Sequence, residues 1–394
     1  MRKFASIICA AMLVPACAED DSTSGVNLRN RENMLLKTGM IYYGEDPDEE
    51  AFDDMYYAFM ADDEEMEKAA AKALVEFKEQ VSGMSAKERK ALGEVFSDFA
   101  DLADMANYVY KDGPAEIPQG WTDLGAKEPR IDKIISRYSV SNGMPTGLKC
   151  SLMGKGDRQM LVFAGTDFPS DWTNMSQVMD FIIDAYEDVN GALFRDASQV
   201  VLAGRLLDEL IAGGYVNVSN LEFAGHSLGG RLASEMAVKY GCPAVLFNAA
   251  GVSPEVYAEY EASKENADGD WRGYVIDVIA ANDPLTCAQR YMSGESDPFV
   301  SSAAKVMSVD KKAVDGWVSF GKGVLGAVVD NLAETSEVMA AVKGVTQAVG
   351  GIVNEYYDRD YRAIGSMMPI REDMEGHGIK GLAAALRARA QICR

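Results

Sequence analysis

Apolar residues recur at helical spacing in the N-terminal part of the chain. Between Ala51 and Tyr110 they return every three to four positions, and lysine and glutamate fill many of the positions between them. This period places apolar side chains on one face of a helix and charged side chains on the other. The pattern stops at Gly113-Pro114, a pair that breaks helices. We therefore predict an N-terminal helical segment over residues 51–112.

The central part of the chain alternates between two patterns. Short, mostly apolar runs typical of buried strands lie at 160–163, 221–224, 244–247 and 274–279. Longer stretches with helical spacing lie at 177–212 and 229–240. Strands that alternate with helices predict an α/β fold, here a mostly parallel sheet flanked by helices.

Residues 300–356 interrupt this alternation. The segment is rich in glycine, alanine and valine, with Trp317 and Phe320 among them. We expect one or two helices with small-residue faces, forming a helical insertion in a domain that spans residues 51–394. Two roles fit it: a lid or acyl-chain-binding element that touches a lipid interface, or an extra helical layer packed on the core.

The chain is strongly acidic. Its 394 residues include 38 lysines and arginines and 61 aspartates and glutamates, a formal net charge of −23. This charge opposes binding to nucleic acid or to anionic lipid headgroups by general attraction. Peripheral contact with a membrane or a lipid surface would therefore have to be apolar and local. Two histidines and scattered cysteines form no ligand cluster, so we expect no metal and no other cofactor.

The N-terminus has the layout of a secretory signal. Arg2 and Lys3 precede a mostly apolar stretch, and small residues at 16–18 fit a cleavage site. We expect residues 1–18 to direct export from a bacterial cytoplasm, and residues 19–50 to form a loose acidic leader. Cleavage after Ala18 would give a soluble periplasmic or secreted protein. Alternatively, residues 14–17 resemble a lipobox, which would leave Cys17 acylated and membrane-anchored, although Pro15 fits this pattern poorly.

Four cysteines lie beyond the predicted signal. They are Cys150, Cys242, Cys287 and Cys393. Export would place them in an oxidising compartment, where four cysteines allow three pairings. The sequence does not choose between these pairings and buried thiols.

The clearest chemical motif is Gly225-His226-Ser227-Leu228-Gly229. A strand is predicted directly before it and a helix directly after it. A serine on a tight strand-to-helix turn adopts a strained backbone, which requires small neighbours on both sides. This setting predicts that Ser227 is the nucleophile of a serine ester hydrolase, with Gly225, His226 and Gly229 forming the nucleophile elbow. The alternative is an ordinary turn between a strand and a helix.

A serine nucleophile needs a base, and the chain has two histidines. His226 lies beside Ser227 in the elbow, where its ring should point away from the hydroxyl, so elimination leaves His377 as the base. The acid that orients the base lies between serine and histidine in the chain order of α/β-hydrolases. Asp283 is best placed, because it follows a strongly apolar strand, and the sites of such sheets lie at strand ends. Asp277, within that strand, is the weaker choice.

The tetrahedral intermediate of ester hydrolysis carries an oxyanion that needs preorganised donors. The backbone N–H of Leu228, directly after the nucleophile, is the first expected donor. The second normally comes from a loop after an earlier strand, and Gly165-Thr166 follows the predicted strand at 160–163. Thr166 offers both an N–H and a hydroxyl, although Gly165-Thr166 taken alone favours a plain turn.

Several motifs follow one another in a familiar order. They are Leu-Val-Phe-Ala-Gly-Thr-Asp at 161–167 with Asp-Trp at 171–172, Gly-His-Ser-Leu-Gly-Gly at 225–230, Asn-Asp-Pro at 282–284 and Gly-His at 376–377. Over about residues 100–290 and around His377, the chain resembles the class 3 (fungal-type) lipases, which are α/β-hydrolases, and their bacterial relatives. The resemblance implies a triad of Ser227, Asp283 and His377 and an oxyanion hole of Thr166 and Leu228. Two features depart from it: alanine at position 164 replaces the usual arginine, and the interval from acid to base is long.

Three functions fit this sequence. The first is an exported lipase or phospholipase A, in which Ser227 forms an acyl-enzyme and water activated by His377 releases the fatty acid. The second keeps the catalytic residues but cleaves acetyl or feruloyl esters of a polysaccharide. The third is a non-catalytic cell-envelope binding protein, which would not need the complete set of catalytic residues. No protein partner is predicted for any of them.

Overall fold

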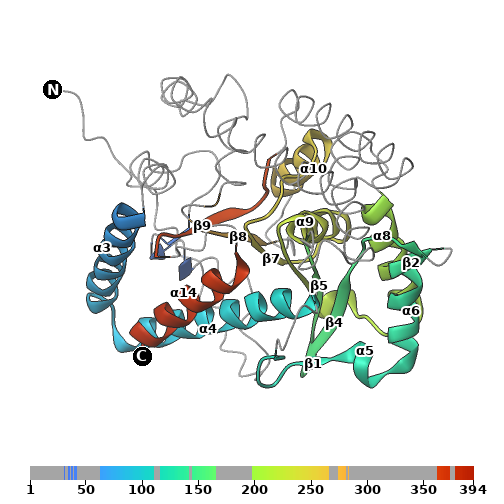
Figure 1. Ribbon diagram of the computed structural model, residues 1–394, viewed down its shortest axis with the longest axis horizontal. Helices are drawn as coiled ribbons and strands as arrows, with labels where there is room; N and C mark the ends of the chain where they lie inside the picture. The colour runs from blue at the N-terminus through green and yellow to red at the C-terminus, as the bar shows by residue number, and fades with distance from the viewer. Residues whose placement is uncertain are drawn as a thin grey trace, which may run out of the picture.

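Seven strands form one sheet in the computed structural model of the chain (Figure 1). The structure describes residues 63–110, 116–141, 144–165, 198–265, 274–280, 362–372 and 378–394, together with Asp283 and single residues between 31 and 41. The strands of the sheet are β1 (Thr122–Asp123), β4 (Cys150–Lys155), β5 (Arg158–Phe163), β6 (Leu221–His226), β7 (Ala244–Phe247), β8 (Val275–Ala280) and β9 (Ser366–Ile370). A separate hairpin pairs β2 (Val140–Ser141) with β3 (Met144–Pro145).

The sheet runs in the order β1-β4-β5-β6-β7-β8-β9. β1, β4 and β5 pair antiparallel, and the strands from β5 to β9 pair parallel. In this register Gly225 lies opposite Phe163, and His226 lies opposite Phe247. The carboxyl ends of the parallel strands therefore meet at one edge of the sheet. This mostly parallel sheet with flanking helices confirms the predicted α/β-hydrolase-like fold.

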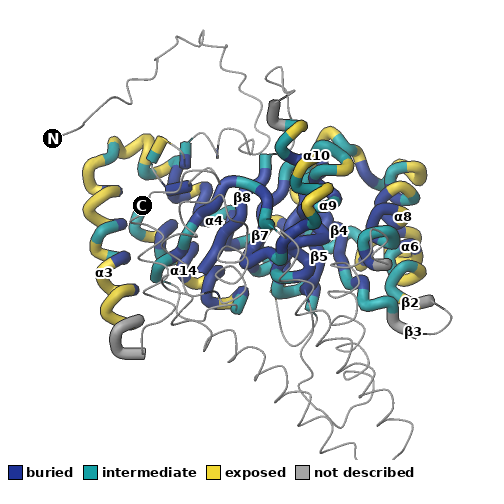
Figure 2. The backbone as a smooth tube through the Cα atoms, turned by 90° about the horizontal axis from the view of Figure 1, so that it is seen from above, coloured by how far each residue is buried: buried dark blue, intermediate teal, exposed yellow. Residues whose placement is uncertain are grey.

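Helices cover both faces of the sheet. Those of the described part are α3 (Asp63–Ser82), α4 (Ala86–Val109), α5 (Leu124–Lys127), α6 (Pro129–Ser139), α8 (Ser198–Ala212), α9 (Leu228–Tyr240), α10 (Pro254–Glu265) and α14 (Ile379–Ile392), with a 3₁₀ turn at Val218–Asn220. Successive strand side chains point to opposite faces. Met160 and Val162 thus join the core under α4 and α14, whereas Leu161 and Phe163 join the core under α8 and α9. Figure 2 shows the resulting buried centre, with α3 exposed along its outer side.

The helix α4 begins at a capping box. The side chain of Ser85 accepts the N–H of Glu88, and the Glu88 carboxylate accepts the N–H of Ser85. The apolar face of α4 packs on the sheet and against α14, which lies beside it in Figure 1. A Cβ atom at Gly93 would lie 3.0 Å from the Cβ of Cys393, so the two helices approach closely at that residue. Helices α3 and α4 fill the described part of the segment predicted to be helical over 51–112.

The end of the expected acidic leader differs from the prediction of a loose segment. Arg31, Leu35, Met40 and Ile41 are all buried, and the last three belong to the same core as α4. Apolar side chains in a mostly acidic stretch explain the difference, because they gain from leaving water wherever a neighbouring core accepts them. This part of residues 19–50 therefore belongs to the folded domain.

A cluster of buried charges lies where this segment meets the sheet. The Asp98 carboxylate of α4 contacts Arg31 at 2.5 Å and Arg158 of β5 at 2.7 Å. Arg158 also contacts Glu222 of β6 at 2.6 Å, and its guanidinium lies 5.1 Å from the centre of the Trp121 ring. The cluster thus ties four parts of the chain together through paired charges: the segment with Arg31, α4, β5 and β6.

Several predicted segments lie outside the described residues. They are the signal at 1–18, the insertion at 300–356 and the first part, 177–197, of the helix predicted over 177–212. The remainder of that last helix is α8. Among the helices that the structure describes, none is both long and apolar enough to cross a membrane.

The cysteines of the described part are buried as thiols. The Cys242 thiol lies 3.6 Å from the carbonyl oxygen of Tyr240 and 3.7 Å from that of Val218. Burial raises the pKa of the Cys393 thiol to about 11. Cys150 is buried in the core under α8, and Cys287 lies outside the described residues.

Candidate active site

The turn between β6 and α9 holds Ser227 in a strained conformation. Its φ is 58° and its ψ is −125°, a region that residues with a side chain rarely adopt. The backbone is fixed on both sides: the N–H of Ser227 donates to Phe247 at 3.1 Å, and its carbonyl accepts the N–H of Ala250 at 3.0 Å. Ser227 is partly exposed at the carboxyl end of the parallel strands. This is the backbone geometry that a nucleophile elbow requires.

The glycines of the motif make this turn possible. A Cβ atom at Gly225 would lie 2.1 Å from the carbonyl oxygen of Gly229. A Cβ atom at Gly229 would lie 2.4 Å from the carbonyl oxygen of Phe163 in β5. Each distance is far shorter than a van der Waals contact, and each involves backbone atoms that cannot rotate away. The spacing of glycine around Ser227 therefore has the steric cause that the sequence predicted.

We expect Gly229→Ala to destabilise the protein by about 1–3 kcal/mol, because the added methyl group forces β5 and α9 apart. Urea unfolding measures this change. Gly83→Ala is the matched control, since a Cβ at Gly83 would meet its nearest neighbour at an ordinary 3.6 Å. Equal unfolding midpoints for the two variants would contradict the steric explanation.

Of the two expected oxyanion donors, Leu228 and Thr166, the structure describes Leu228. Leu228 is the first residue of α9, so its N–H has no acceptor within the helix, and the positive end of the helix dipole lies there. On the other side, a Cβ atom at Gly165 would lie 2.9 Å from the Cβ of Ser227, so the chain leaving β5 passes directly beside the nucleophile. Thr166, the next residue, lies outside the described residues.

His226 faces the helix α4. Its ring is buried, and its Nδ1 lies 2.7 Å from the hydroxyl of Tyr110. The two rings meet edge to face with their centres 6.0 Å apart. This contact supports the view that His226 is not the base. His377 itself lies outside the described residues.

Asp283 is completely buried beyond the end of β8. Its N–H donates to the carbonyl of Ala280 at 3.1 Å, which turns the chain directly after the strand. Asp277, the weaker choice for the acid, is also buried, and its carboxylate accepts the N–H of Ala249 at 3.5 Å. Asp277 therefore contacts the backbone next to β7, whereas Asp283 lies past the carboxyl end of β8.

Two described residues near this edge were not predicted from the sequence. Asn248 has a φ of 45°, and its side-chain oxygen accepts the N–H of Ala280 at 2.8 Å, joining the ends of β7 and β8. Asparagine tolerates positive φ, and its place at the end of an apolar run is the signal that could have revealed it. Tyr110 is the other residue; it caps the C-terminus of α4 and is far away in the sequence.

The turn after β9 is held by α14. The Arg389 guanidinium binds the Glu372 carboxylate, with Nη2 2.8 Å from Oε2, and lies 5.0 Å from the centre of the Phe77 ring. Glu372 is the last described residue before position 377, and α14 begins two residues after that position. The structure thus describes the residues on both sides of position 377, up to Glu372 and from 378 onward.

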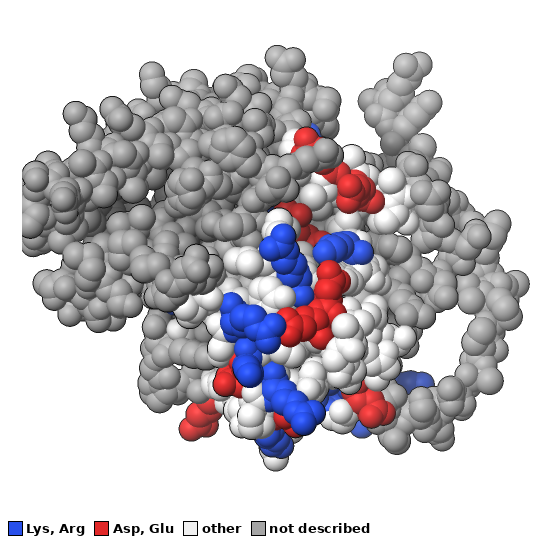
Figure 3. Space-filling model, turned by 90° about the vertical axis from the view of Figure 1, so that its right-hand side faces the viewer, with Lys and Arg blue, Asp and Glu red and all other residues white. Residues whose placement is uncertain are grey.

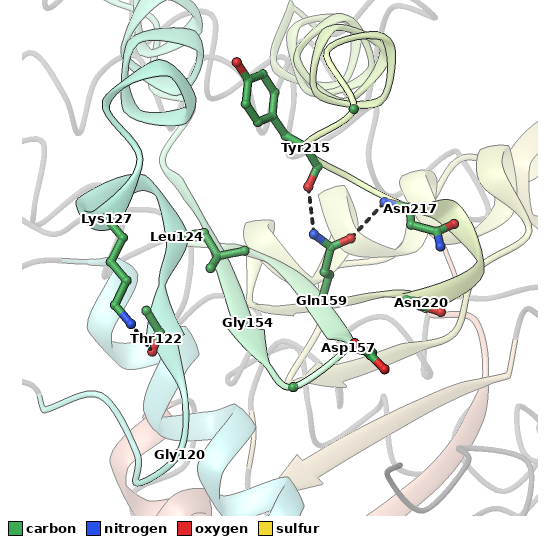
Figure 4. Close-up of a pocket in the computed structure, with 12 residues that line it drawn as sticks. Gly120, Thr122, Leu124, Lys127, Gly154, Asp157, Gln159, Tyr215, Asn217 and Asn220 are labelled. Atoms are coloured by element: carbon green, nitrogen blue, oxygen red, sulfur yellow. Dashed lines mark hydrogen bonds between the residues drawn. The ribbon is translucent and has the colours of Figure 1, made fainter. Parts of the chain in front are cut away.

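A polar cavity of about 540 Å³ lies at the opposite edge of the sheet (Figure 4). Gln159 at the start of β5 and Asn220 just before β6 line it, whereas Ser227 follows the carboxyl end of β6. The Gln159 amide is bound to the backbone of Tyr215 and Asn217. A strand of six residues separates the two edges by about 20 Å. This cavity is therefore distinct from the candidate active site.

The described residues contain no group of three or more histidine, cysteine, aspartate or glutamate side chains that could hold a metal ion.

On the face that carries α6 and α8, basic and acidic side chains lie next to one another, as Figure 3 shows. Arg137, for example, contacts Glu209 at 2.9 Å there. Opposite charges thus partly cancel on that face, despite the strongly negative charge of the whole chain.

Comparison with known proteins identifies the family. Residues 101–355, more than half of the chain, match the model of the phospholipase-like family described as "Tle-like phospholipase domain". Among solved structures, the chain is similar to the extracellular lipase LipA from Serratia marcescens, with 16% identity, a TM-score of 0.32, and coverage of 49% of this chain and 40% of that one. The chain thus spans less than half the length of that lipase. No curated protein sequence matches it significantly. The chain belongs to the Tle-like phospholipase domain family.

Proposed function

We propose that the protein is an exported serine carboxylic-ester hydrolase that cleaves acyl esters of lipids, as a lipase or phospholipase A. Membership of a phospholipase-like family supports a lipid ester as the substrate. The observation that carries the proposal is the strained backbone of Ser227 at the start of α9, beside the chain that leaves β5. Serine held in this way presents its hydroxyl above the carboxyl edge of the sheet, where a substrate carbonyl can approach.

In the proposed reaction, the base, the acid and the oxyanion donors each have a separate role. His377 takes the proton of the Ser227 hydroxyl as its oxygen attacks the ester carbonyl, and Asp283 orients and stabilises the resulting imidazolium. The N–H of Leu228 and the N–H or hydroxyl of Thr166 stabilise the oxyanion. The intermediate collapses to an acyl-enzyme as His377 protonates the leaving alcohol. Water, deprotonated by His377, then releases the fatty acid and restores the serine.

Export is the second part of the proposal. The charged start, apolar stretch and small residues of positions 1–18 support it. The product is periplasmic or secreted if cleavage follows Ala18, and membrane-anchored if Cys17 is acylated. The mass of the N-terminal peptide of the mature protein distinguishes these products, and an intact Met1 would contradict export.

Labelling with a fluorophosphonate probe tests the catalytic part. We expect the wild type to be labelled and Ser227→Ala to remain unlabelled, because the probe reacts only with an activated serine. Ser219→Ala is the matched control, since Ser219 is exposed and lies just before β6, at the other edge of the sheet. An unlabelled wild type, or labelling that survives in Ser227→Ala, would contradict the proposal.

A substrate panel then identifies the ester. We expect release of fatty acid from phosphatidylcholine vesicles or triacylglycerol emulsions, together with activity on p-nitrophenyl esters of long acyl chains. Activity confined to acetyl or feruloyl esters would replace the lipase assignment with that of a polysaccharide esterase. Absence of activity together with absence of labelling would favour a binding protein on the same fold.

A further inference from the structure

The hydroxyl of Tyr110 connects the two sides of the candidate active site. It accepts the backbone N–H of Gly165 at 2.9 Å, where the chain leaves β5. It also lies 2.7 Å from Nδ1 of His226, directly before the nucleophile. Because the hydroxyl has a single hydrogen, donating it to Nδ1 of a neutral His226 while accepting the N–H of Gly165 satisfies all three groups.

Gly165 is enclosed on the sides that face the elbow. A Cβ atom there would lie 2.5 Å from the Tyr110 hydroxyl, 2.5 Å from the carbonyl oxygen of His226 and 2.9 Å from the Cβ of Ser227. The backbone of Gly165 therefore lies against the nucleophile turn with no room for a side chain. Its backbone N–H donates to the Tyr110 hydroxyl. The phenol thus contributes the directional contact that sets the position of this backbone.

Tyr110 itself is held firmly. It caps the C-terminus of α4, which packs along the sheet, and α14 packs beside that helix. A tyrosine on a packed helix loses little freedom when it binds, so it fixes its partners better than a loop side chain would. The family match begins at residue 101 and thus includes this turn of α4.

We propose that Tyr110 is a positioning residue of the oxyanion hole, which holds the chain after β5 against the nucleophile elbow through Gly165 and His226. This role rests on the proposed function. An oxyanion donor works only when it is already aimed at the place where negative charge develops. Residue 165 directly precedes the expected donor Thr166, so release of its N–H lets that donor drift from the intermediate.

Tyr110→Phe tests the role, because it removes the hydroxyl and keeps the ring. Loss of one oxyanion donor lowers kcat by about 100- to 1000-fold, so imperfect placement of a donor should lower it by about 10- to 100-fold. KM should change by less than about threefold, because the substrate ester carries little charge in the ground state. Affinity for an alkyl boronic acid, which forms a tetrahedral adduct with the serine, should fall by about the same factor as kcat.

Tyr108→Phe is the matched control. Tyr108 belongs to the same helix, and its hydroxyl contacts the Asp123 carboxylate at 3.2 Å, away from the elbow. This variant should keep the kcat and boronic acid affinity of the wild type. If Tyr110→Phe does not fold, His226→Asn and His226→Ala carry the test. Asparagine offers an acceptor near the position of Nδ1 and should retain at least about ten times the kcat of the alanine variant.

Two failures can be told apart. An active wild type whose kcat and boronic acid affinity are unchanged in Tyr110→Phe overturns the role of Tyr110 alone, as do equal kcat values for His226→Asn and His226→Ala. A wild type that hydrolyses no ester and does not react with the fluorophosphonate probe overturns the proposed function and this role with it. Parallel losses of kcat and boronic acid affinity, with KM preserved, support the role.

Discussion

Replacing His377 with alanine is expected to lower kcat for ester hydrolysis by about four orders of magnitude or more, with little change in KM. Without a base, the Ser227 hydroxyl keeps its proton, and nothing protonates the leaving alcohol. The other histidine cannot compensate, because its Nδ1 lies against the Tyr110 hydroxyl and its ring faces α4. Steady-state hydrolysis of a soluble p-nitrophenyl ester measures the loss.

His226→Asn is the control for His377→Ala. It removes the second imidazole but offers an acceptor to Tyr110, so its loss of kcat should be smaller than that of His377→Ala by about 100-fold or more.

The pH profile of the wild type gives a second measure of the base. In the wild type, kcat/KM should fall as the pH drops through the pKa of the base, which is about 6.5 for an ordinary histidine. A nearly inactive His226→Asn beside an active His377→Ala would reverse the assignment of the base.

The central strands were predictable because their sequences carry a strong and local signal. The runs ending at Phe163 and Phe247 are apolar at almost every position, and both became strands buried on two faces. A parallel sheet covered by helices requires such runs, so the pattern indicates both the strand and its surroundings. The elbow was predictable because its glycine spacing is a short motif, although the contact that excludes a side chain at Gly229 comes from Phe163 in β5.

The strands β4 and β9 were not predictable in the same way. β9 contains two methionines and Pro369, and β4 ends in Gly154-Lys155, so neither resembles a typical strand. Among the described residues, β9 is the last strand of the sheet and pairs only with β8, and a proline is tolerated in such an edge strand. The pairing that makes these segments strands comes from neighbours distant in the sequence.

The support of the site is distant in the sequence as well. Tyr110 reaches His226 across 116 positions and Gly165 across 55. The period of α4 predicts which of its faces is buried, but it does not predict which hydroxyl at its end meets the elbow. Sequence motifs therefore predict the reacting groups, whereas the contacts of Tyr110 with Gly165 and His226 emerge only when α4 is placed against the sheet.

Replacing Arg158 with leucine is expected to lower the free energy of unfolding by about 3–5 kcal/mol. The change leaves the carboxylates of Asp98 and Glu222 in a buried cluster in which Arg31 remains the partner of Asp98. A buried charge that loses its partner keeps its desolvation penalty but no longer gains the attraction that offset it. Urea unfolding followed by circular dichroism measures the loss. Arg137→Leu is the matched control, since its pair with Glu209 is largely exposed and should contribute less than about 1 kcal/mol.

The pH dependence of this loss separates charge from packing. Burial alone would raise the pKa of Asp98, but Arg158 and Arg31 outweigh it and hold that pKa below its ordinary value. In the wild type, the stability contributed by this pairing is therefore complete above the unfolded pKa of about 3.9 and is lost as the pH falls through the folded pKa. Without Arg158, burial should dominate and raise the pKa of Asp98, so that acidification favours folding of the variant by neutralising the buried carboxylate. The difference in unfolding free energy between wild type and Arg158→Leu should then shrink between pH 7 and about pH 4. A difference that stays constant over this range would attribute the loss to the packing of the Arg158 side chain on Trp121 instead.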